Sequence, residues 1–209
     1  MKGRKVSQAV IRRLPRYYRH LELLLAHGGD HISSGELAGR MDLNPSQVRQ
    51  DLNCFGGFGQ QGYGYHVETL YKELGTILGL NDRYKVIVVG AGNIGQALTR
   101  YEGFADQGFD IVALFDIDEA IVGTVLSGIP VHHVDTMEEY IRENTIDIGI
   151  IAARRRAAQD IADRMVAGGI RGIWNFVPTD VAANVPVENV HLSDSMLVLS
   201  YNIKAKERE

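Results

Sequence analysis

The strongest limit on the fold comes from a glycine-rich segment at residues 90–95, GAGNIG. It follows the apolar run 84–90 and opens a helical pattern at about residue 93. A G-x-G-x-x-G motif between a buried strand and a helix is typical of a dinucleotide-binding turn, where glycines permit the turn, the approach of a pyrophosphate and the packing of the helix. The segment predicts a nucleotide site that includes Gly90, Ala91, Gly92, Asn93, Ile94 and Gly95.

Strand and helix patterns alternate over the second part of the chain. Apolar strand patterns occupy 84–90, 110–116, 128–134, 147–153, 169–176 and 187–192. Helical patterns begin at about residue 93 and lie near 136–144 and 156–168, and a C-terminal segment covers 194–206. This alternation predicts an α/β fold with a Rossmann-like, doubly wound parallel sheet covered by helices.

Further nucleotide contacts are expected where the strands end, because ligands gather at the carboxyl ends of parallel strands. Asp116 ends the second strand and Asp118 follows it. An acid there accepts hydrogen bonds from the adenosine ribose and repels a 2′-phosphate, which favours NAD over NADP. The fourth and fifth strands add Ala152, Ala153, Arg154, Asn175 and Phe176. Phe176 is a candidate for packing near a nicotinamide ring, and core packing is an equal alternative.

The first part of the chain has the pattern of a helix-turn-helix. A helical pattern covers 17–27, and Ser33 with Glu36 forms a capping-box arrangement at the start of a second helix. After a turn at 42–44, Asn44 is an N-cap and Pro45 occupies the first helical position of a third helix, 45–55. Two short capped helices joined by a tight turn predict a DNA-binding unit.

The third helix and the segment after it supply the candidate DNA contacts. Val48, Leu52 and Phe55 share one face, so the opposite face is expected to be exposed. The segment 56–65, GGFGQQGYGY, predicts a hairpin that acts as a wing. An alternative is a helical dimerisation module. The candidate contacts to bases and phosphates are Ser46, Gln47, Arg49, Gln50, Asn53, Tyr63, Gly64 and Tyr65.

Charge is distributed unevenly. The net charge of the 209 residues is −4, of which residues 1–80 contribute +3 and residues 81–209 contribute −7. Seven basic residues precede the first acid, Glu22. A basic end on an acidic chain indicates a polyanion as partner. The basic residues are Lys2, Arg4, Lys5, Arg12, Arg13, Arg16 and Arg19, of which Arg12 and Arg13 are the candidate phosphate contacts.

Composition narrows the class of protein. Cys54 is the single cysteine, so no internal disulfide forms and a reducing, cytoplasmic location is expected. No apolar run is long enough to span a membrane. Cys54 has no cysteine partner and His132-His133 lacks a recognised ligand spacing, so no metal site is expected.

The main alternative function is an NAD-dependent dehydrogenase. Such an enzyme needs an acid or base beside the substrate. His132, His133 and His191 are candidates by residue type alone, and the roughly 115 residues after the glycine motif are used by the sheet itself. The sequence therefore predicts that the chain is not an enzyme. A nucleotide- or CoA-binding subunit of a larger enzyme is a third possibility, against which the helix-turn-helix argues.

Several longer motifs follow one another along the chain. They are ISSGELAGRM, PSQVRQDL, FGGFGQQGYGY, GAGNIGQAL and NFVP. In these the chain resembles the Rex family of redox-sensing transcriptional repressors. The resemblance implies a homodimer that binds an inverted-repeat operator, is released by NADH and keeps DNA affinity with NAD⁺. It implies a winged-helix domain at 1–80, a Rossmann domain at 81–192, and a C-terminal helix at 193–209, roughly Asp194–Lys206, swapped into the partner subunit.

Two departures from the family pattern stand out. Arg154, Arg155 and Arg156 follow the fourth strand where the family usually has Val-Pro, and they add positive charge near the expected pyrophosphate. The family couples its two domains through an Arg, a Tyr and an Asp, which correspond here to Arg19, Tyr101 and His191. Because histidine titrates near neutral pH, the resemblance implies a coupling that depends on pH.

Overall fold

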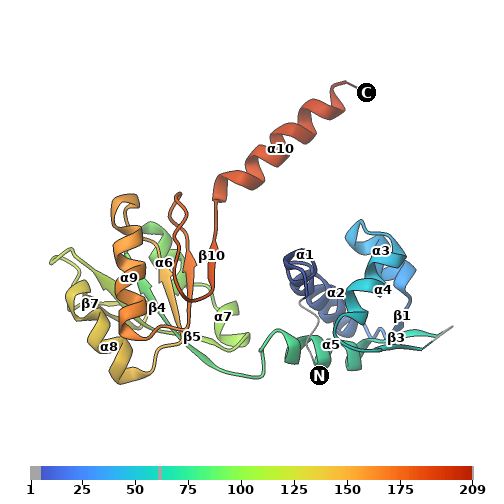
Figure 1. The fold of residues 1–209 in the computed structure, drawn as a ribbon, viewed down its shortest axis with the longest axis horizontal. Helices are drawn as coiled ribbons and strands as arrows, with labels where there is room; N and C mark the ends of the chain where they lie inside the picture. Colours follow the sequence, from blue (N-terminus) through green and yellow to red (C-terminus); the bar gives the residue numbers. More distant parts are fainter. Residues whose placement is uncertain (1–5, 61–62, 209) are drawn as a thin grey trace. The chain divides into compact units, whose positions relative to one another are not determined.

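The computed structural model describes residues 6–60 and 63–208, so Lys2, Arg4, Lys5 and positions 61–62 of the predicted hairpin lie outside it. The chain forms two compact units, residues 1–82 and 83–209 (Figure 1). The division falls two residues after the boundary expected from sequence, and the C-terminal helix is grouped with the second unit.

The first unit is a helical bundle with a small antiparallel sheet. Its sheet has the strand order β1-β3-β2, and β3 pairs with both neighbours. The predicted helices and hairpin are present, whereas α1 and β1, which are only four and two residues long, had no clear sequence signal. The elements are α1 (Gln8–Ile11), α2 (Leu14–Ala26), β1 (His31–Ile32), α3 (Ser34–Met41), α4 (Pro45–Asn53), β2 (Gly59–Gln60), β3 (Gly64–His66) and α5 (Val67–Ile77).

The helix-turn-helix, α3 and α4, begins at the caps expected from sequence. The Ser33 side chain accepts a hydrogen bond from the Glu36 backbone N–H, and the Glu36 carboxylate accepts one from the Ser33 N–H. Asn44 Oδ1 accepts a hydrogen bond from the Gln47 N–H at 2.8 Å. Val48 and Leu52 of α4 are buried in a core shared with α2, α3 and α5, and Phe55 packs against it. These contacts hold α4 with its opposite face outward.

The second unit is a seven-stranded sheet in the order β10-β9-β8-β4-β5-β7-β6, and every pair is parallel except β6 with β7. The predicted strands and helices are present, and α7 and β6 are additional short elements. The elements are β4 (Tyr84–Val89), α6 (Asn93–Thr99), α7 (Gly103–Asp106), β5 (Phe109–Asp116), β6 (Val125–Leu126), β7 (Ile129–His133), the 3₁₀ turn η1 (Val134–Thr136), α8 (Met137–Asn144), β8 (Ile148–Ile151), the 3₁₀ turn η2 (Arg155–Ala157), α9 (Ala158–Gly168), β9 (Gly172–Asn175), β10 (Val187–Asn189) and α10 (Leu192–Lys206).

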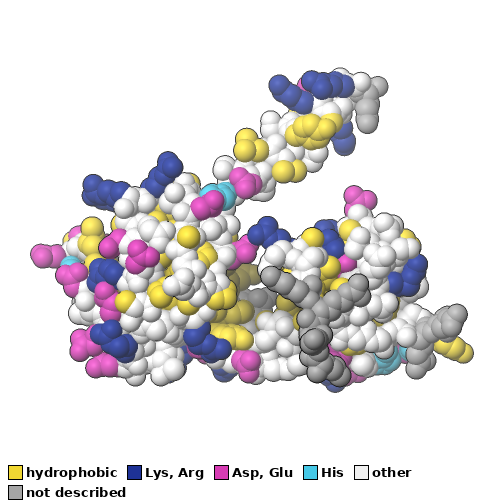
Figure 2. All heavy atoms as spheres, in the orientation of Figure 1, with side chains coloured by type: hydrophobic (Ala, Val, Ile, Leu, Met, Phe, Trp, Pro, Cys, Tyr) yellow, Lys and Arg dark blue, Asp and Glu magenta, His cyan; other side chains and the backbone are white. Residues whose placement is uncertain are grey.

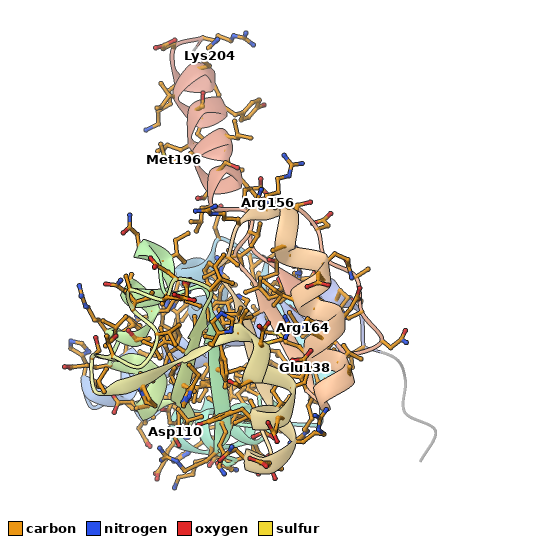
Figure 3. The ribbon with its side chains drawn as sticks, turned by 90° about the vertical axis from the view of Figure 1, so that its left-hand side faces the viewer. Asp110, Glu138, Arg156, Arg164, Met196 and Lys204 are labelled. Carbon is orange, nitrogen blue, oxygen red and sulfur yellow. The ribbon has the colours of Figure 1, made fainter. Side chains whose placement is uncertain are left out.

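Strand β4 buries both faces, because successive side chains of a strand point to opposite sides. Ile87 and Val89 join the cluster that includes residues of α8 and α9, whereas Val86 and Val88 join a second cluster with Leu98 of α6. Helices α8 and α9 are also joined by an ion pair, in which Arg164 donates to Glu138 at 2.8 Å (Figure 3). The sheet is thus doubly wound, as predicted.

The C-terminal helix α10 has an unusual surface. None of its 15 residues is buried. Hydrophobic side chains lie along its exposed surface, ahead of basic residues at its end (Figure 2). The exposed apolar residues are Leu192, Met196, Leu197, Val198, Leu199, Tyr201 and Ile203. Apolar exposure on this scale is typical of a surface that contacts another protein.

Candidate nucleotide and DNA sites

The glycine motif forms a tight junction between β4 and α6. Gly90 has a φ of +104°, a conformation that side chains other than glycine rarely adopt, and a Cβ atom there would lie 2.5 Å from the Ala152 carbonyl oxygen. A Cβ on Gly95 would collide with the Gly90 carbonyl oxygen. By contrast, a Cβ on Gly92 would meet nothing within 4 Å. The first and third glycines are therefore required by packing, whereas the second borders open space.

That open space belongs to a cavity of about 590 Å³. It lies where the carboxyl ends of three strands are aligned, since Val89 of β4 pairs with Phe115 of β5 and with Ile151 of β8. From β4 the sheet grows first on one side, through β5 and β7, and then on the other side, through β8, β9 and β10. The cavity therefore lies at the switch point of the sheet, where the strand order reverses direction. Seven of the predicted nucleotide residues line the cavity: Gly90, Gly92, Asp116, Asp118, Ala152, Ala153 and Arg154.

The Asp116 carboxylate connects the two strand ends that border the cavity. One oxygen accepts a hydrogen bond from the Ala91 N–H at 2.7 Å. The other accepts from the N–H groups of Ile117, at 2.7 Å, and Asp118, at 3.1 Å. Asp116 thus holds the glycine turn against the end of β5. Carboxylate oxygens have about four acceptor sites, so capacity remains for a ligand hydroxyl.

The cavity has an apolar wall that was not anticipated from sequence. This wall comes from Val89, Phe115, Val134, Ala157 and Ile161, which also belong to the core of the sheet. An apolar sequence pattern predicts that such residues are buried, but it does not show which of them also border a cavity. Arg156 lines the cavity beside Arg154, and it lies just before α9 (Figure 3). The sequence placed the run of three arginines near the pyrophosphate, although only Arg154 was named as a contact.

The assignment of Asn175 to the nucleotide is wrong. Its side chain is fully buried, and its amide donates to the Thr179 carbonyl at 2.7 Å and to Asn189 Oδ1 at 2.8 Å. Its own oxygen accepts from the Val177 N–H. These bonds fix the loop after β9, because a buried amide must satisfy its polar atoms within the protein.

Phe176 is not among the residues that line the cavity. It packs against Trp174, with ring centroids 4.5 Å apart, in a cluster on one face of the sheet. Core packing, the alternative left open by the sequence, describes its position. Ala91, which is buried, and Asn93, Ile94 and Gly95 do not line the cavity either, although they belong to the turn that borders it.

On α4, four of the five predicted reading residues are exposed: Ser46, Arg49, Gln50 and Asn53. The Arg49 guanidinium donates to Ser34 Oγ at 2.9 Å and to Ser46 Oγ at 3.1 Å. Arg49 therefore lies across the N-terminal turns of α3 and α4, where it adds positive charge to the exposed face of the helix-turn-helix. Arg12 is also exposed.

The structure changes the interpretation of Arg13 and Gln47, because both contact Asp51, a fully buried residue of α4 that the sequence did not single out. Arg13 donates to the carboxylate through Nε at 2.5 Å and Nη2 at 2.8 Å, and Tyr17 donates to it at 2.9 Å. Gln47 donates to it at 2.7 Å. Gln47 is therefore only partly exposed, and the guanidinium of Arg13 is engaged in an internal ion pair.

Asp51 stays charged in this network. Burial by itself would raise the pKa of the Asp51 carboxyl, but the hydrogen bonds from Arg13, Gln47 and Tyr17 outweigh burial and lower its pKa below the ordinary value. Burial, and then the bond to Asp51, raise the pKa of Tyr17. The buried Asp51 carboxylate accepts four hydrogen bonds from three side chains. Those from Tyr17 of α2 and from Arg13, just before α2, fix α4 against α2.

The two tyrosines of the hairpin differ in exposure to solvent. Tyr63 is 76% exposed, as expected for a wing, whereas Tyr65 is 6% exposed and belongs to the core of the first unit. The prediction of a DNA contact by Tyr65 is wrong, because side chains alternate along β3 and Tyr65 points inward. Gly64, between them, has a φ of +78°, and a Cβ there would collide with the Ile32 carbonyl oxygen.

Comparisons with known proteins agree with this architecture. A model described as "Putative DNA-binding protein N-terminus" matches residues 5–53, and a CoA binding domain model matches residues 81–179. The chain is 51% identical to the redox-sensing transcriptional repressor Rex of Caldicellulosiruptor bescii, over 98% of this chain and 95% of that protein. It is 48% identical to the protein of the same name from Clostridium beijerinckii, over 99% of both chains.

Solved structures show the same relationship. The crystal structure of RSP in complex with β-NAD⁺ and operator DNA has 50% identity to this chain and a TM-score of 0.92, and covers 98% of this chain and 95% of RSP. The complex of RSP with β-NADH has 47% identity to this chain and a TM-score of 0.91. The match covers 98% of this chain and 97% of RSP. RSP is described as a Rex-family repressor. The chain belongs to the Rex family.

The three residues predicted to couple the domains, Arg19, Tyr101 and His191, lie on both units. Arg19 is exposed on α2. Tyr101 is 58% exposed, with its ring beside that of Phe104. His191 Nε2 lies 2.8 Å from Asp180 Oδ1. A carboxylate from a different loop thus lies beside His191, the residue predicted to stand at the family's Asp position.

The dehydrogenase alternative is not favoured for this Rex-family chain. Its named relatives are transcriptional repressors. His132, His133 and His191 are not among the residues that line the cavity. In the part of the chain that the structure describes, no three His, Cys, Asp or Glu side chains are grouped as metal ligands. Over the same residues, no helix has both the length and the apolar character needed to cross a membrane.

Proposed function

We propose that this chain is a transcriptional repressor that binds operator DNA through its first unit and NAD(H) through its second, and that NADH releases it from DNA. The observation that carries the proposal is the RSP structure with β-NAD⁺ and operator DNA, which superimposes on nearly the whole chain at 50% identity. The exposed face of α4 and the cavity at the switch point supply the two sites that this function needs.

The cavity fits a dinucleotide in size and chemistry. A volume of about 590 Å³ lies within the roughly 300–1,000 Å³ common for ligand sites. The apolar wall suits an adenine ring, and Asp116 and Asp118 suit the hydroxyls of its ribose. The turn at Gly92 leaves room for a pyrophosphate, and Arg154 and Arg156 add positive charge. NADH acts as the effector and NAD⁺ as its competitor, and we infer that the chain catalyses no reaction on either.

The proposed DNA surface consists of the exposed residues of the first unit. Ser46, Gln50 and Asn53 suit base edges, and Arg12, Arg49 and Tyr63 suit phosphates or grooves. We infer a homodimer, in which two α4 helices enter successive major grooves of an inverted repeat. The apolar surface of α10 supports a swap of residues 193–209 into the partner subunit. Because the partner is DNA, we infer a cytoplasmic location.

Coupling is proposed to pass through Arg19, Tyr101 and His191 with its neighbour Asp180. Ligand binding shifts the balance between two arrangements of the dimer, and the shift cannot exceed the difference in affinity of the ligand for them. The reduced nicotinamide ring is neutral and the oxidised ring carries a positive charge. A pocket that prefers the neutral ring therefore responds to the NADH/NAD⁺ ratio.

The test is a titration of operator binding with NADH at a fixed NAD⁺ concentration, using an inverted-repeat duplex from a candidate promoter. We expect DNA affinity to fall as NADH rises. Binding that ignores NADH would refute the sensor, and a protein that binds no duplex would refute the repressor. An assay of nicotinamide oxidation with small alcohols and acids serves as the control for enzyme activity.

A further inference from the structure

The hydrogen bonds of Asp51 determine how Gln47 presents its side-chain amide. Both Asp51 oxygens are occupied: Oδ2 accepts from Arg13 Nε and the Tyr17 hydroxyl, and Oδ1 accepts from Arg13 Nη2 and Gln47 Nε2. A carboxylate that is charged can only accept hydrogen bonds. The Gln47 amide must therefore turn its NH₂ group toward Asp51, and the opposite orientation would set two oxygens against each other.

The same contact leaves the other end of the amide available. Gln47 is partly exposed, and its Oε1 has no hydrogen-bond partner among residues 6–60 and 63–208. Gln47 is the third residue of α4, in the first helical turn. Recognition helices contact base edges mainly through residues near their N-terminal end. An acceptor, held in one orientation, is thus displayed where a base edge would lie.

We propose that Asp51 is a specificity-determining residue that acts through Gln47, so that α4 reads an exocyclic amino group in the major groove. Adenine and cytosine carry such a donor, at N6 and N4, whereas guanine and thymine carry carbonyl oxygens at the equivalent edge. This inference rests on the proposed function, in which α4 is the recognition helix. It adds a fixed amide orientation to the expectation that Gln47 contacts bases or phosphates.

A purely structural role for Asp51 makes a different prediction. In that case, any loss of a bond to Asp51 would weaken the fold and lower affinity for every duplex alike. The network allows the two roles to be separated, because Tyr17 and Gln47 contact different oxygens of Asp51. Tyr17→Phe removes one bond to Oδ2 and leaves the bond from Gln47 in place, so it is the matched control.

The experiment begins with the full-length wild-type protein and a pool of randomised duplexes. The enriched inverted repeat is labelled with fluorescein, and each half-site position is replaced in turn by all four bases for measurement of Kd by anisotropy. We expect one position per half-site where A and C bind alike and roughly tenfold more tightly than G or T, a penalty usual for one mismatched pair. In Asp51→Asn, whose amide can face Gln47 either way, the preference at that position should fall below about threefold. Tyr17→Phe should retain it.

Gln47→Met provides a second test if Asp51→Asn fails to fold, because it leaves the bonds of Asp51 to Arg13 and Tyr17 intact. It should bind DNA without the preference at that position. The inference is overturned if no position shows the A and C preference, if Tyr17→Phe loses it as Asp51→Asn does, or if Gln47→Met keeps it. A wild-type protein that enriches no duplex overturns the proposed function itself, and this inference with it.

Discussion

Replacement of Gly92 by alanine should separate nucleotide binding from stability. The added methyl group would meet nothing within 4 Å, and the φ of −74° at Gly92 is ordinary for alanine. Because Gly92 is the N-cap of α6, where glycine is preferred over alanine, we expect the free energy of unfolding to fall by no more than about 1 kcal/mol. The methyl group would instead fill space beside the glycine turn, where the proposed pyrophosphate lies.

The loss of affinity can be estimated from the contact removed. A hydrogen bond to a charged group contributes about 1.5–3 kcal/mol. If the methyl group displaces the pyrophosphate from one backbone N–H, NADH affinity should fall about 10- to 150-fold, since about 1.4 kcal/mol corresponds to a factor of ten. Titration of NADH fluorescence measures the affinity, and circular dichroism measures Tm.

Two further variants make the comparison decisive. Gly39→Ala, at an exposed position of α3 with nothing within 4 Å, should bind NADH as the wild type does. Gly95→Ala should lower Tm, because its methyl group collides with the Gly90 carbonyl oxygen. A Gly92→Ala protein that binds NADH with wild-type affinity, or that melts as early as Gly95→Ala, would refute the placement of the pyrophosphate.

Three other outcomes are expected. Arg49→Ala should lower operator affinity roughly 10- to 100-fold in a mobility-shift assay with NADH affinity unchanged; an unchanged shift would remove Arg49 from the DNA surface. Because the pKa of Tyr17 is raised in the folded chain, its contribution to stability is complete below about pH 10 and is lost as pH rises further. The Tm of Tyr17→Phe should therefore fall less than that of the wild type between pH 7 and pH 11. An equal decrease in Tm for both proteins would contradict this. Removal of residues 192–209 should give a monomer by sedimentation, and a dimer would argue against the role of α10.

The arrangement of strands, helices and the glycine turn could be predicted because it depends on local signals. The caps at Ser33 and Asn44 form with residues three positions away, and the strand patterns reflect burial on both faces of the sheet. Gly90, Gly92 and Asp116 occur at strand ends, which the order of elements locates directly.

The errors arose where the role of a side chain depends on distant partners. Asp51 is buried because Arg13, 38 residues away, neutralises its charge, and no local pattern shows this pairing. Asn175 ends a strand at the correct edge, but it is bonded to Asn189 and Thr179 rather than to the cavity. Tyr65 was assigned to the wing as part of a motif, although alternation along the strand turns it inward.

The hydrophobic cores of the described residues are confined to one unit or the other: one cluster holds the first unit, and two clusters cover the faces of the sheet in the second. A substitution within one core therefore leaves the packing of the other core unchanged. In evolution, operator preference and nucleotide affinity could drift as separate traits, constrained together only at the few residues that transmit the signal. A chimaera that joins residues 1–82 of one relative to residues 83–209 of another should inherit each trait from its own parent.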